Sequence, residues 1–294
     1  MQPNSNASTS KLHTQEFVKQ VWSQGKVLYR DLPWRNIDDP YAVFVSEVML
    51  QQTQVRRVID YWQRFMSLFP TLDALASSDS ALVLEQWQGL GYNRRALSLK
   101  KAAEICAKDF QGQMPRSDEE LQKLPGIGPA TAAGIRAFAL RQPSVYIETN
   151  VRAVYIHHFF PDAQNVKDAD LYPLVKNTCS NEDPRGWYYA LLDYGARLKA
   201  LHANPARKSA HHVKQSSFEG SRRQKRAALL RFVLESPGIG FEELFCALND
   251  FELQAKRPKL ALELFESILD DMLSEGFFKR TNEGDTHETE HFFA

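Results

Sequence analysis

The chain has 294 residues, enough for two domains with a well-buried core, and its 43% hydrophobic and 24% charged residues are ordinary for a globular protein. No apolar run approaches the ~20 residues of a membrane span, and residues 1–14 lack the apolar core of a secretion signal. We therefore expect an intracellular protein, cytoplasmic or associated with the nucleoid, with no membrane contact. The net charge of zero hides a basic stretch over 196–231, with ten Lys/Arg and one acid, followed by an acidic one.

Leucine, alanine and charged residues recur at helical spacing along most of the chain, which predicts an all-α fold. Proline and glycine punctuate the gaps between the helical stretches. The pattern predicts helices over 15–30, 41–55, 57–67, 73–77, 80–88, 93–110, 117–123, 129–140, 150–159, 168–179, 185–200, 222–235, 240–249 and 258–276. A short strand is indicated only over 277–281.

The second expected helix carries a lone acid, Glu47, in the apolar run Phe44-Val-Ser-Glu-Val-Met-Leu50. An acid in such a setting is costly unless it has a use, because burial disfavours the carboxylate and raises the pKa. A carboxyl group that stays protonated near neutral pH suits general acid catalysis. A capping or salt-bridged glutamate is the plainer interpretation.

Residues 124–134 form a glycine hairpin between two expected helices, with the sequence Leu-Pro-Gly-Ile-Gly-Pro-Ala-Thr-Ala-Ala-Gly. Gly126 and Gly128 lack a Cβ, so the turn can adopt positive φ and bring backbone N–H groups close to a DNA phosphate. Twenty residues after Gly128, Glu148 stands at an expected helix start in Val145-Tyr-Ile-Glu-Thr-Asn150. A plain N-cap would also account for this acid.

These two motifs are accompanied by Leu32-Pro-Trp-Arg35, by Asp39–Val55 with its run SEVMLQQTQV, and by Gly89-Leu-Gly-Tyr92. Together they resemble the helix-hairpin-helix DNA glycosylases, from about residue 18 to Ala196. Within that superfamily the motifs are most similar to those of the adenine DNA glycosylases, which remove adenine mispaired with oxidised guanine. SEVMLQQTQV is long and highly specific.

The resemblance implies two helical domains with the substrate cleft between them, and a small winged-helix-like unit follows. We expect a disordered 1–14, a second helical domain from 15–36 and 148–200, a six-helix domain with the hairpin over 37–147, a basic linker over 201–221, the winged-helix-like unit over 222–282 and an acidic tail over 283–294. The third helix of that unit carries Glu263, Glu266, Asp270 and Asp271, which would repel phosphate. We therefore expect a packing or partner module there, and no β-rich domain that reads oxidised guanine.

Breaking a purine N-glycosidic bond develops positive charge on the sugar and negative charge on the base, which two carboxyl groups with separated pKa values can stabilise. The resemblance makes Glu47 the acid that protonates adenine. It places Glu148 where the family has its catalytic aspartate, with Asn150 holding it; the extra methylene shifts the carboxylate by ~1 Å. Ala130 stands where the glycosylase/lyases carry a lysine nucleophile, so we expect a monofunctional hydrolase that uses water.

The resemblance also assigns residues that contact the base and the DNA. The expected pocket for the flipped adenine consists of Arg30, Trp34, Arg35 and Asp193. The expected DNA contacts are Gln51 or Gln52 and Tyr92 at the gap left by the extruded base, and Gly126, Gly128, Ala130 and Thr131 in the hairpin. Core packing or capping would also account for Trp34, Tyr92 and Asp193.

The adenine glycosylases usually carry four closely spaced cysteines after the motif that matches Leu192–Ala196. Here Cys106, Cys179 and Cys246 are 73 and 67 residues apart, and no spacing suits zinc or an iron–sulfur cluster. We expect no cofactor and no metal. Basic residues in the region are expected to replace the phosphate contacts of the cluster loop: Lys208, Lys214, Arg222, Arg223, Lys225 and Arg226.

The expected function is removal of a mispaired adenine, opposite guanine or oxidised guanine, from duplex DNA by a monomer that flips the base. The same scaffold also serves glycosylases that remove thymine or uracil from mismatches, and a non-catalytic DNA-damage-binding protein is a third interpretation. Arg30, Arg35 and Glu47 favour a purine. A pure binder would gain nothing from burying Glu47.

Overall fold

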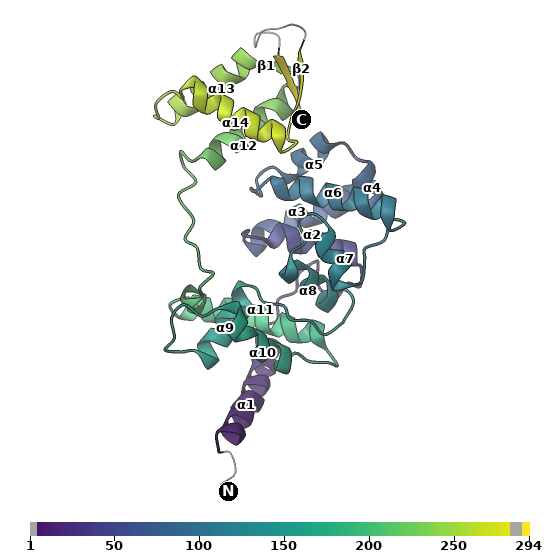
Figure 1. Cartoon of the computed structure of the whole chain (residues 1–294), viewed down its shortest axis with the longest axis vertical. Helices are drawn as coiled ribbons and strands as arrows, with labels where there is room; N and C mark the ends of the chain where they lie inside the picture. The colour runs from purple at the N-terminus through teal and green to yellow at the C-terminus, as the bar shows by residue number, and fades with distance from the viewer. Residues whose placement is uncertain (1–4, 283–289) are drawn as a thin grey trace. The chain divides into compact units, whose positions relative to one another are not determined.

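The computed structural model describes residues 5–282 and 290–294, with the side chains of 5–12 and 282 excepted. The chain divides into two compact units, each built from two separate stretches. Unit 1 comprises residues 1–48 and 114–213, and unit 2 comprises residues 49–113 and 214–294. Figure 1 shows their elements along the chain. None of the described helices is long and apolar enough to cross a membrane.

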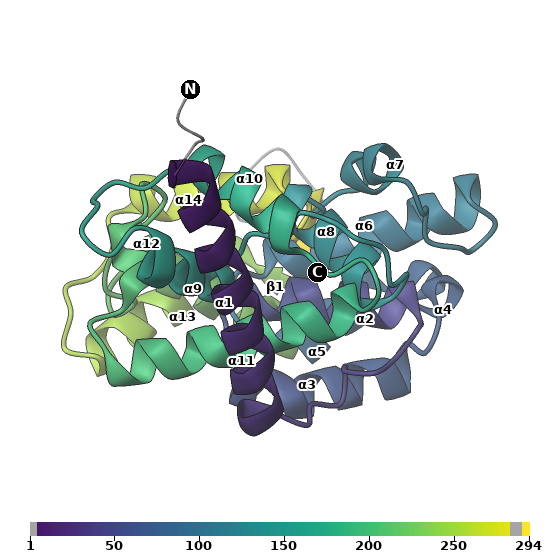
Figure 2. The same cartoon turned by 90° about the horizontal axis from the view of Figure 1, so that it is seen from below.

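Unit 1 is built around a long helix, α11, against which α1, α8 and α9 pack. Its elements are α1 (Ser5–Leu28), α2 (Pro40–Leu50), which continues into unit 2, α7 (Asp118–Lys123), α8 (Pro129–Phe138), α9 (Thr149–Phe159), α10 (Asp168–Thr178), α11 (Pro184–Leu201) and the 3-10 helix η1 (Pro205–Lys208). Figure 2 shows α1 crossing α11. Gly25 permits this close approach, because a Cβ there would lie 2.3 Å from the Cβ of Ala190. Because α8 packs on α11, the glycine hairpin before α8 belongs to unit 1. The family pattern led us to expect this hairpin in a domain over 37–147.

Unit 2 begins with four helices that enclose the buried rings of Phe65 and Trp87. These helices are α3 (Val55–Leu68), α4 (Leu72–Ser77), α5 (Ser80–Trp87) and α6 (Arg94–Asp109). The side chains of Thr71 and Asp79 cap α4 and α5 by accepting a backbone N–H, which explains where these short helices start.

The C-terminal part of unit 2 has the order of a winged helix. It contains α12 (Arg222–Glu235), β1 (Ile239–Gly240), α13 (Phe241–Gln254), α14 (Leu262–Ser274), β2 (Lys279–Asn282) and β3 (Glu290–Phe293). The strands form an antiparallel sheet in the order β1-β3-β2, with Ile239 opposite Phe292 and Arg280 opposite the same residue. Side chains of α12, α13 and α14 pack together beside the sheet.

The helices occupy the stretches predicted from the sequence, with some different ends. The helix α1 begins at Ser5, so residues 5–14 are helical where we expected disorder. The helix α2 ends at Leu50 because Gln52 has a positive φ of 54°, which a right-handed helix cannot accommodate. The all-α fold class is confirmed, but the strands β1 and β3 were not predicted. Two residues of β1 are too few to show alternation, and β3 lies in the expected acidic tail, where the fully buried Phe292 anchors it; residues 283–289 of that tail lie outside the described residues.

Candidate active site

Glu47 lies on α2 in unit 1, where its side chain is half-buried. The hydroxyl of Tyr146 donates a hydrogen bond to Glu47 Oε2 at 3.0 Å. On the other side, a Cβ at Gly134 would lie 2.6 Å from the same oxygen, so only glycine leaves room for the carboxyl group. Burial raises the pKa of Glu47 to about 8; the Tyr146 hydrogen bond acts in the opposite direction, and the charge of Glu148 adds to the rise.

These contacts make Glu47 a protonated acid at neutral pH. Tyr146 is buried, and its own pKa is raised well above the usual value by burial and then by the negative charges of Glu47 and Glu148. Tyr146 therefore keeps its proton and acts as a donor to Oε2. This arrangement favours the acidic proton on Oε1, from which it can pass to a ligand. Tyr146 and Gly134 were both missed by the sequence analysis.

Glu148 is the N-cap of α9. Its Oε1 accepts from the backbone N–H of Asn150 at 2.5 Å and of Val151 at 2.9 Å, and its Oε2 accepts from Asn150 Nδ2 at 3.1 Å. Burial raises the pKa of Glu148, while these N–H donors and the charge of Lys199 oppose the rise. Since both oxygens meet only N–H donors at the positive end of a helix, the geometry suits the anion.

Asn150 is itself held by the packing of α9 on α11. A Cβ at Gly195 of α11 would lie 2.3 Å from the carbonyl oxygen of Asn150. The absence of a side chain at Gly195 thus lets α11 support the turn that presents Glu148. The structure brings Glu47, Glu148 and Asn150 together in unit 1, whereas the family pattern led us to expect Glu47 and Glu148 in two different domains.

Replacing Tyr146 by phenylalanine is expected to move the pH dependence of any reaction in which Glu47 donates a proton. The tyrosine hydrogen bond lowers the pKa of Glu47, so its loss raises that pKa and shifts the alkaline fall in rate to higher pH. The rate at pH 7 should also fall by about tenfold, because the anion formed by proton transfer loses a hydrogen bond. Single-turnover rates from pH 6 to 10 measure both effects.

Tyr155→Phe is the matched control, because Tyr155 is also buried in unit 1 and bonds Thr178 instead of Glu47. Its pH profile should equal that of the wild type. An alkaline limb at the same pH in Tyr146→Phe as in the wild type would show that Tyr146 does not influence the pKa of Glu47.

The residues expected to line the base pocket form a buried ion-pair network. Arg35 Nη1 and Nη2 bond the two carboxylate oxygens of Asp193 at 2.7 and 2.8 Å, and Arg30 Nε bonds Asp193 Oδ1 at 2.5 Å. Arg35 Nη1 also donates to the carbonyl of Arg30, and the rings of Tyr29 and Tyr189 lie 5.1 and 4.4 Å from its guanidinium carbon.

This network changes the role expected for Arg35 and Asp193. Both are buried, at 5% and 3% exposed, and their polar atoms are used within the protein, so they hold the 30–35 segment against α11 instead of contacting a base. Trp34 is also buried. Arg30 is the exposed member, with 36% of its side chain accessible, and it alone of the three charged residues is placed to meet a ligand.

Asp193→Asn is expected to lower the free energy of unfolding by about 3–5 kcal/mol, because it leaves the buried guanidinium of Arg35 without a counter-charge. Urea unfolding followed by tryptophan fluorescence measures the change. Asp31→Asn, at an exposed position beside the network, should alter stability by less than about 0.5 kcal/mol. Equal stability of the two variants would show that the Arg35–Asp193 pair contributes nothing.

The hairpin between α7 and α8 exposes Gly126, Gly128 and Ala130. Leu124 and Ile127 are buried and anchor the turn, and Gly126 has a φ of 81° that favours glycine. The helix α8 begins at Pro129, as predicted, and the side chain of Thr131 is buried, so the exposed part of the turn consists of Gly126, Gly128, Pro129 and Ala130.

Residues 45–174, which include both acids, match the model of the HhH-GPD superfamily of base excision DNA repair proteins. The chain is 37% identical over 180 residues to an adenine DNA glycosylase of Buchnera aphidicola, covering 60% of this chain and 50% of the relative. It is 35% identical over 241 residues to an adenine DNA glycosylase of Rattus norvegicus, covering 78% of this chain and 45% of the relative.

The chain belongs to the helix-hairpin-helix DNA glycosylase superfamily. It spans about half the length of the relatives named above. The fold is shared with a solved thermostable thymine-DNA glycosylase, with a TM-score of 0.59, 22% identity, and coverage of 64% of this chain and 88% of that one.

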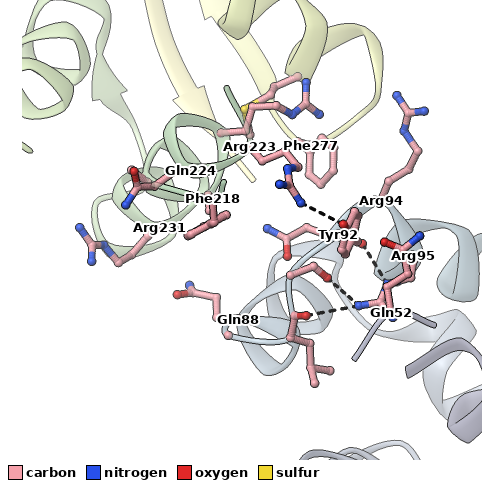
Figure 3. A pocket seen from close by; sticks show the side chains of 18 of the residues that line it. Gln52, Gln88, Tyr92, Arg94, Arg95, Phe218, Arg223, Gln224, Arg231 and Phe277 are labelled. Carbon is pink, nitrogen blue, oxygen red and sulfur yellow. Dashed lines mark hydrogen bonds between the residues drawn. The ribbon is translucent and has the colours of Figure 1, made fainter. Parts of the chain in front are cut away.

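In this superfamily member, the residues expected at the gap left by an extruded base lie in unit 2. Gln52 and Tyr92 line a cavity of about 900 Å³, together with Gln51 (Figure 3). Arg95, which the sequence analysis missed, joins the two loops that carry them by donating to the carbonyls of Gln51 at 2.6 Å and Gly91 at 2.8 Å. Burial lowers the pKa of Arg95 to about 10, so it remains charged at neutral pH.

Basic residues of α12 form ion pairs with acidic residues that are distant in the sequence. Arg222 lies 2.6 Å from Asp271, Arg226 lies 2.5 Å from Glu275, and Lys225 is buried 3.4 Å from Glu252. These three cations are thus partly neutralised, which weakens the expectation that they bind phosphate. Lys208 donates to the carbonyl of Pro161, and Lys214 is exposed.

The cysteines of the chain do not fit the iron–sulfur cluster of the adenine glycosylases. A [4Fe–4S] cluster takes four thiolates, whereas Cys106 is buried in α6, Cys179 follows α10, and Cys246 is exposed on α13. Where the cluster loop is expected, η1 packs on α9, and a backbone bridge joins Val166 to Ser209. In the described part of the chain, no three His, Cys, Asp or Glu side chains are grouped to hold a metal ion.

Proposed function

We propose that this protein is a monofunctional DNA glycosylase that removes adenine from a mispair with guanine or oxidised guanine in duplex DNA. The observation that carries the proposal is the pairing of a protonated acid, Glu47, with an anion-binding setting at Glu148 within one unit. The names of the relatives and the helix-hairpin-helix family support it. The proposal includes a monomer that acts on nucleoid DNA and uses no metal or other cofactor.

In the proposed reaction, Glu47 gives its proton to a ring nitrogen of the flipped adenine. The C1′–N9 bond then breaks, and its electron pair leaves with the base. The Glu148 carboxylate stabilises the positive charge on C1′, and a water molecule adds to that carbon. The proton released by the water returns to Glu47, which restores the acid. The products are adenine and an abasic site in an intact strand.

Ala130 makes a specific prediction about the product. It occupies the exposed second residue of α8, where a lysine would be needed for a Schiff base, and its methyl group cannot attack the sugar. We expect enzyme treatment alone to leave the strand intact and alkali to cleave it. Trapping of a covalent protein–DNA adduct by borohydride would contradict this and implicate another lysine.

The test of the proposed function is single-turnover excision on a matched set of duplexes. Each contains adenine, thymine or uracil opposite guanine or 8-oxoguanine, and the released base is identified by mass spectrometry. We expect release of adenine from both mispairs. Release of thymine or uracil alone would make the protein a pyrimidine mismatch glycosylase, and binding without release of any base would make it a non-catalytic damage-binding protein.

A further inference from the structure

The cavity of unit 2 has a lining that is strongly positive. It lies between the loops around Gln52 and Tyr92 and the segment 215–231 (Figure 3). Its cations are Arg57, Arg94, Arg95, Arg223, Arg226 and Arg231, and its single acid is Glu275. Such a lining indicates a ligand rich in acceptor atoms.

The arginines of the cavity differ in the partners that their guanidinium groups already have within the protein. Arg94 and Arg226 both pair with Glu275, and Arg95 bonds backbone carbonyls. In the part of the chain that the structure describes, neither Arg57 nor Arg223 has a carboxylate within 4.0 Å. Each therefore presents an uncompensated charge to the cavity.

Arg223 is held by two neutral acceptors. Its Nη1 donates to the hydroxyl of Tyr92 at 2.9 Å, and its Nη2 donates to the carbonyl of Ser216 at 2.8 Å. The guanidinium thus presents two N–H groups in a fork, and a ligand with two acceptors on one edge could replace both partners. Figure 3 shows the Arg223 side chain directed toward Tyr92.

Two aromatic rings are exposed at the same cavity. Tyr92 is 39% exposed and Phe218 is 49% exposed, although both line the cavity. Exposed rings beside an arginine form a surface on which a flat base can stack. A phosphate alone would make no use of these rings.

The backbone of the loops supports a binding role. Gln52 and Tyr92 both have positive φ, 54° and 49°, which is uncommon for residues with side chains and especially for an aromatic one. The amide of Gln215 donates hydrogen bonds to Gln52 Oε1 and to the Tyr92 hydroxyl. The strained loops and the start of the C-terminal segment therefore form one polar cluster around Tyr92.

We propose that this cavity receives the base opposite the one that is excised, and that it selects guanine. Guanine carries two acceptors, O6 and N7, on one edge, and arginine is the side chain that binds this pair in bidentate fashion. Arg223 would make that contact while Tyr92 and Phe218 stack on the ring. Adenine presents an N6 amino donor in place of O6, and 8-oxoguanine carries a hydrogen on N7, so each faces the arginine donors unfavourably, and the cavity prefers unmodified guanine among the partner bases.

The proposal rests on the proposed function, because only a base-flipping enzyme leaves a partner base without its pair. It also gives the winged-helix unit a role in DNA binding that does not depend on the acidic helix α14. The acids Glu263 and Asp270 are exposed on α14 and would repel DNA, whereas Phe218, Arg223 and Arg226, before and at the start of α12, line the cavity.

The test measures binding, not excision. Dissociation constants are determined by fluorescence anisotropy for duplexes with adenine carrying a 2′-fluorine on its sugar, which slows cleavage. The base opposite is guanine, hypoxanthine, 7-deazaguanine, which lacks N7, or 2-aminopurine, which lacks O6. Wild-type protein should bind guanine and hypoxanthine about tenfold more tightly than the other two.

Arg223→Ala should bind all four duplexes with the same affinity. Arg222→Ala is the matched control, since the adjacent arginine pairs with Asp271 outside the cavity, and it should keep the tenfold preference. Phe218→Ala should lower the affinity for all four duplexes by at least about fivefold. Its affinity for a duplex with an abasic site opposite the adenine should equal that of the wild type. Circular dichroism and thermal unfolding verify that the variants fold.

A preference retained in Arg223→Ala would overturn the proposal. An equal loss of affinity for every duplex, the abasic one included, would also overturn it, because Arg223 would then contact a phosphate. Excision of ordinary adenine, measured in parallel, separates this proposal from the proposed function. Excision without any preference for the partner base would refute guanine selection by the cavity and leave the proposed function intact. A preference that depends on Arg223, without excision, would refute the proposed function alone.

Discussion

Glu47→Gln is expected to bind a duplex with a mispaired adenine as tightly as the wild type and to excise the adenine at least about 100-fold more slowly. Glutamine keeps the shape of the side chain and can still accept from Tyr146 at its amide oxygen. It has no acidic proton for the leaving base, so negative charge develops on adenine without neutralisation. Alkali-induced strand cleavage under single-turnover conditions measures the rate, and anisotropy measures the binding.

Glu85→Gln is the matched control for this variant, because Glu85 is an exposed glutamate of α5 in unit 2. Its rate should equal that of the wild type. Normal excision by Glu47→Gln would reject Glu47 as the general acid.

Glu148→Gln is expected to lower the excision rate by a similar factor of about 100, because the amide is neutral and cannot stabilise the positive sugar. It also turns an NH₂ group toward the N–H donors of Asn150 and Val151, which weakens the cap of α9 by about 1 kcal/mol. Single-turnover rates at saturating enzyme separate the catalytic loss from any loss of binding.

Glu148→Asp separates charge from shape. Aspartate keeps the negative charge and caps helices well, and it is the residue that the family resemblance leads one to expect. We expect it to retain more activity than Glu148→Gln. Lower activity in the aspartate variant than in the glutamine variant would show that the charge of Glu148 is not what the reaction uses.

The helices of this protein could be predicted from local signals. Thr71, Asp79 and Ser221 cap helices near the positions that the patterns indicate, since an N-cap depends on residues two or three positions away. Glu47 could be recognised for the same reason, because its apolar neighbours lie on its own helix. The strand β3 could not be, because its pairing with β1 joins residues 53 positions apart, such as Ile239 and Phe292.

The environment of each site residue depended on contacts that are distant in sequence. Tyr146 meets Glu47 across 99 residues, and Asp193 meets Arg35 across 158 residues. The first contact gives the carboxyl group of Glu47 a hydrogen-bond donor, and no local sequence pattern predicts that donor. The second turns Arg35 inward, although its sequence neighbourhood favoured a base contact.

The charge segregation of the C-terminal part was misleading in a similar way. The basic start of α12 and the acidic helix α14 lie in separate stretches of sequence, but Arg222 and Arg226 pair with Asp271 and Glu275 in the folded unit. A count of charges along the chain treats such cations as available for DNA. Arg223 lacks an acidic partner in the described structure, and only the folded positions of its neighbours reveal this.

The central claim is that Glu47 is a protonated acid that delivers its proton to the leaving base, and the pH dependence of excision tests it most directly. Since burial raises the pKa of Glu47 to about 8, the active protonated form is present at neutral pH and is lost as the pH rises through that value. The single-turnover rate of adenine excision should therefore fall about tenfold per pH unit above pH 8, and Glu47→Gln should show no such limb. A wild-type rate that stays level or increases between pH 7 and pH 10 would contradict the account.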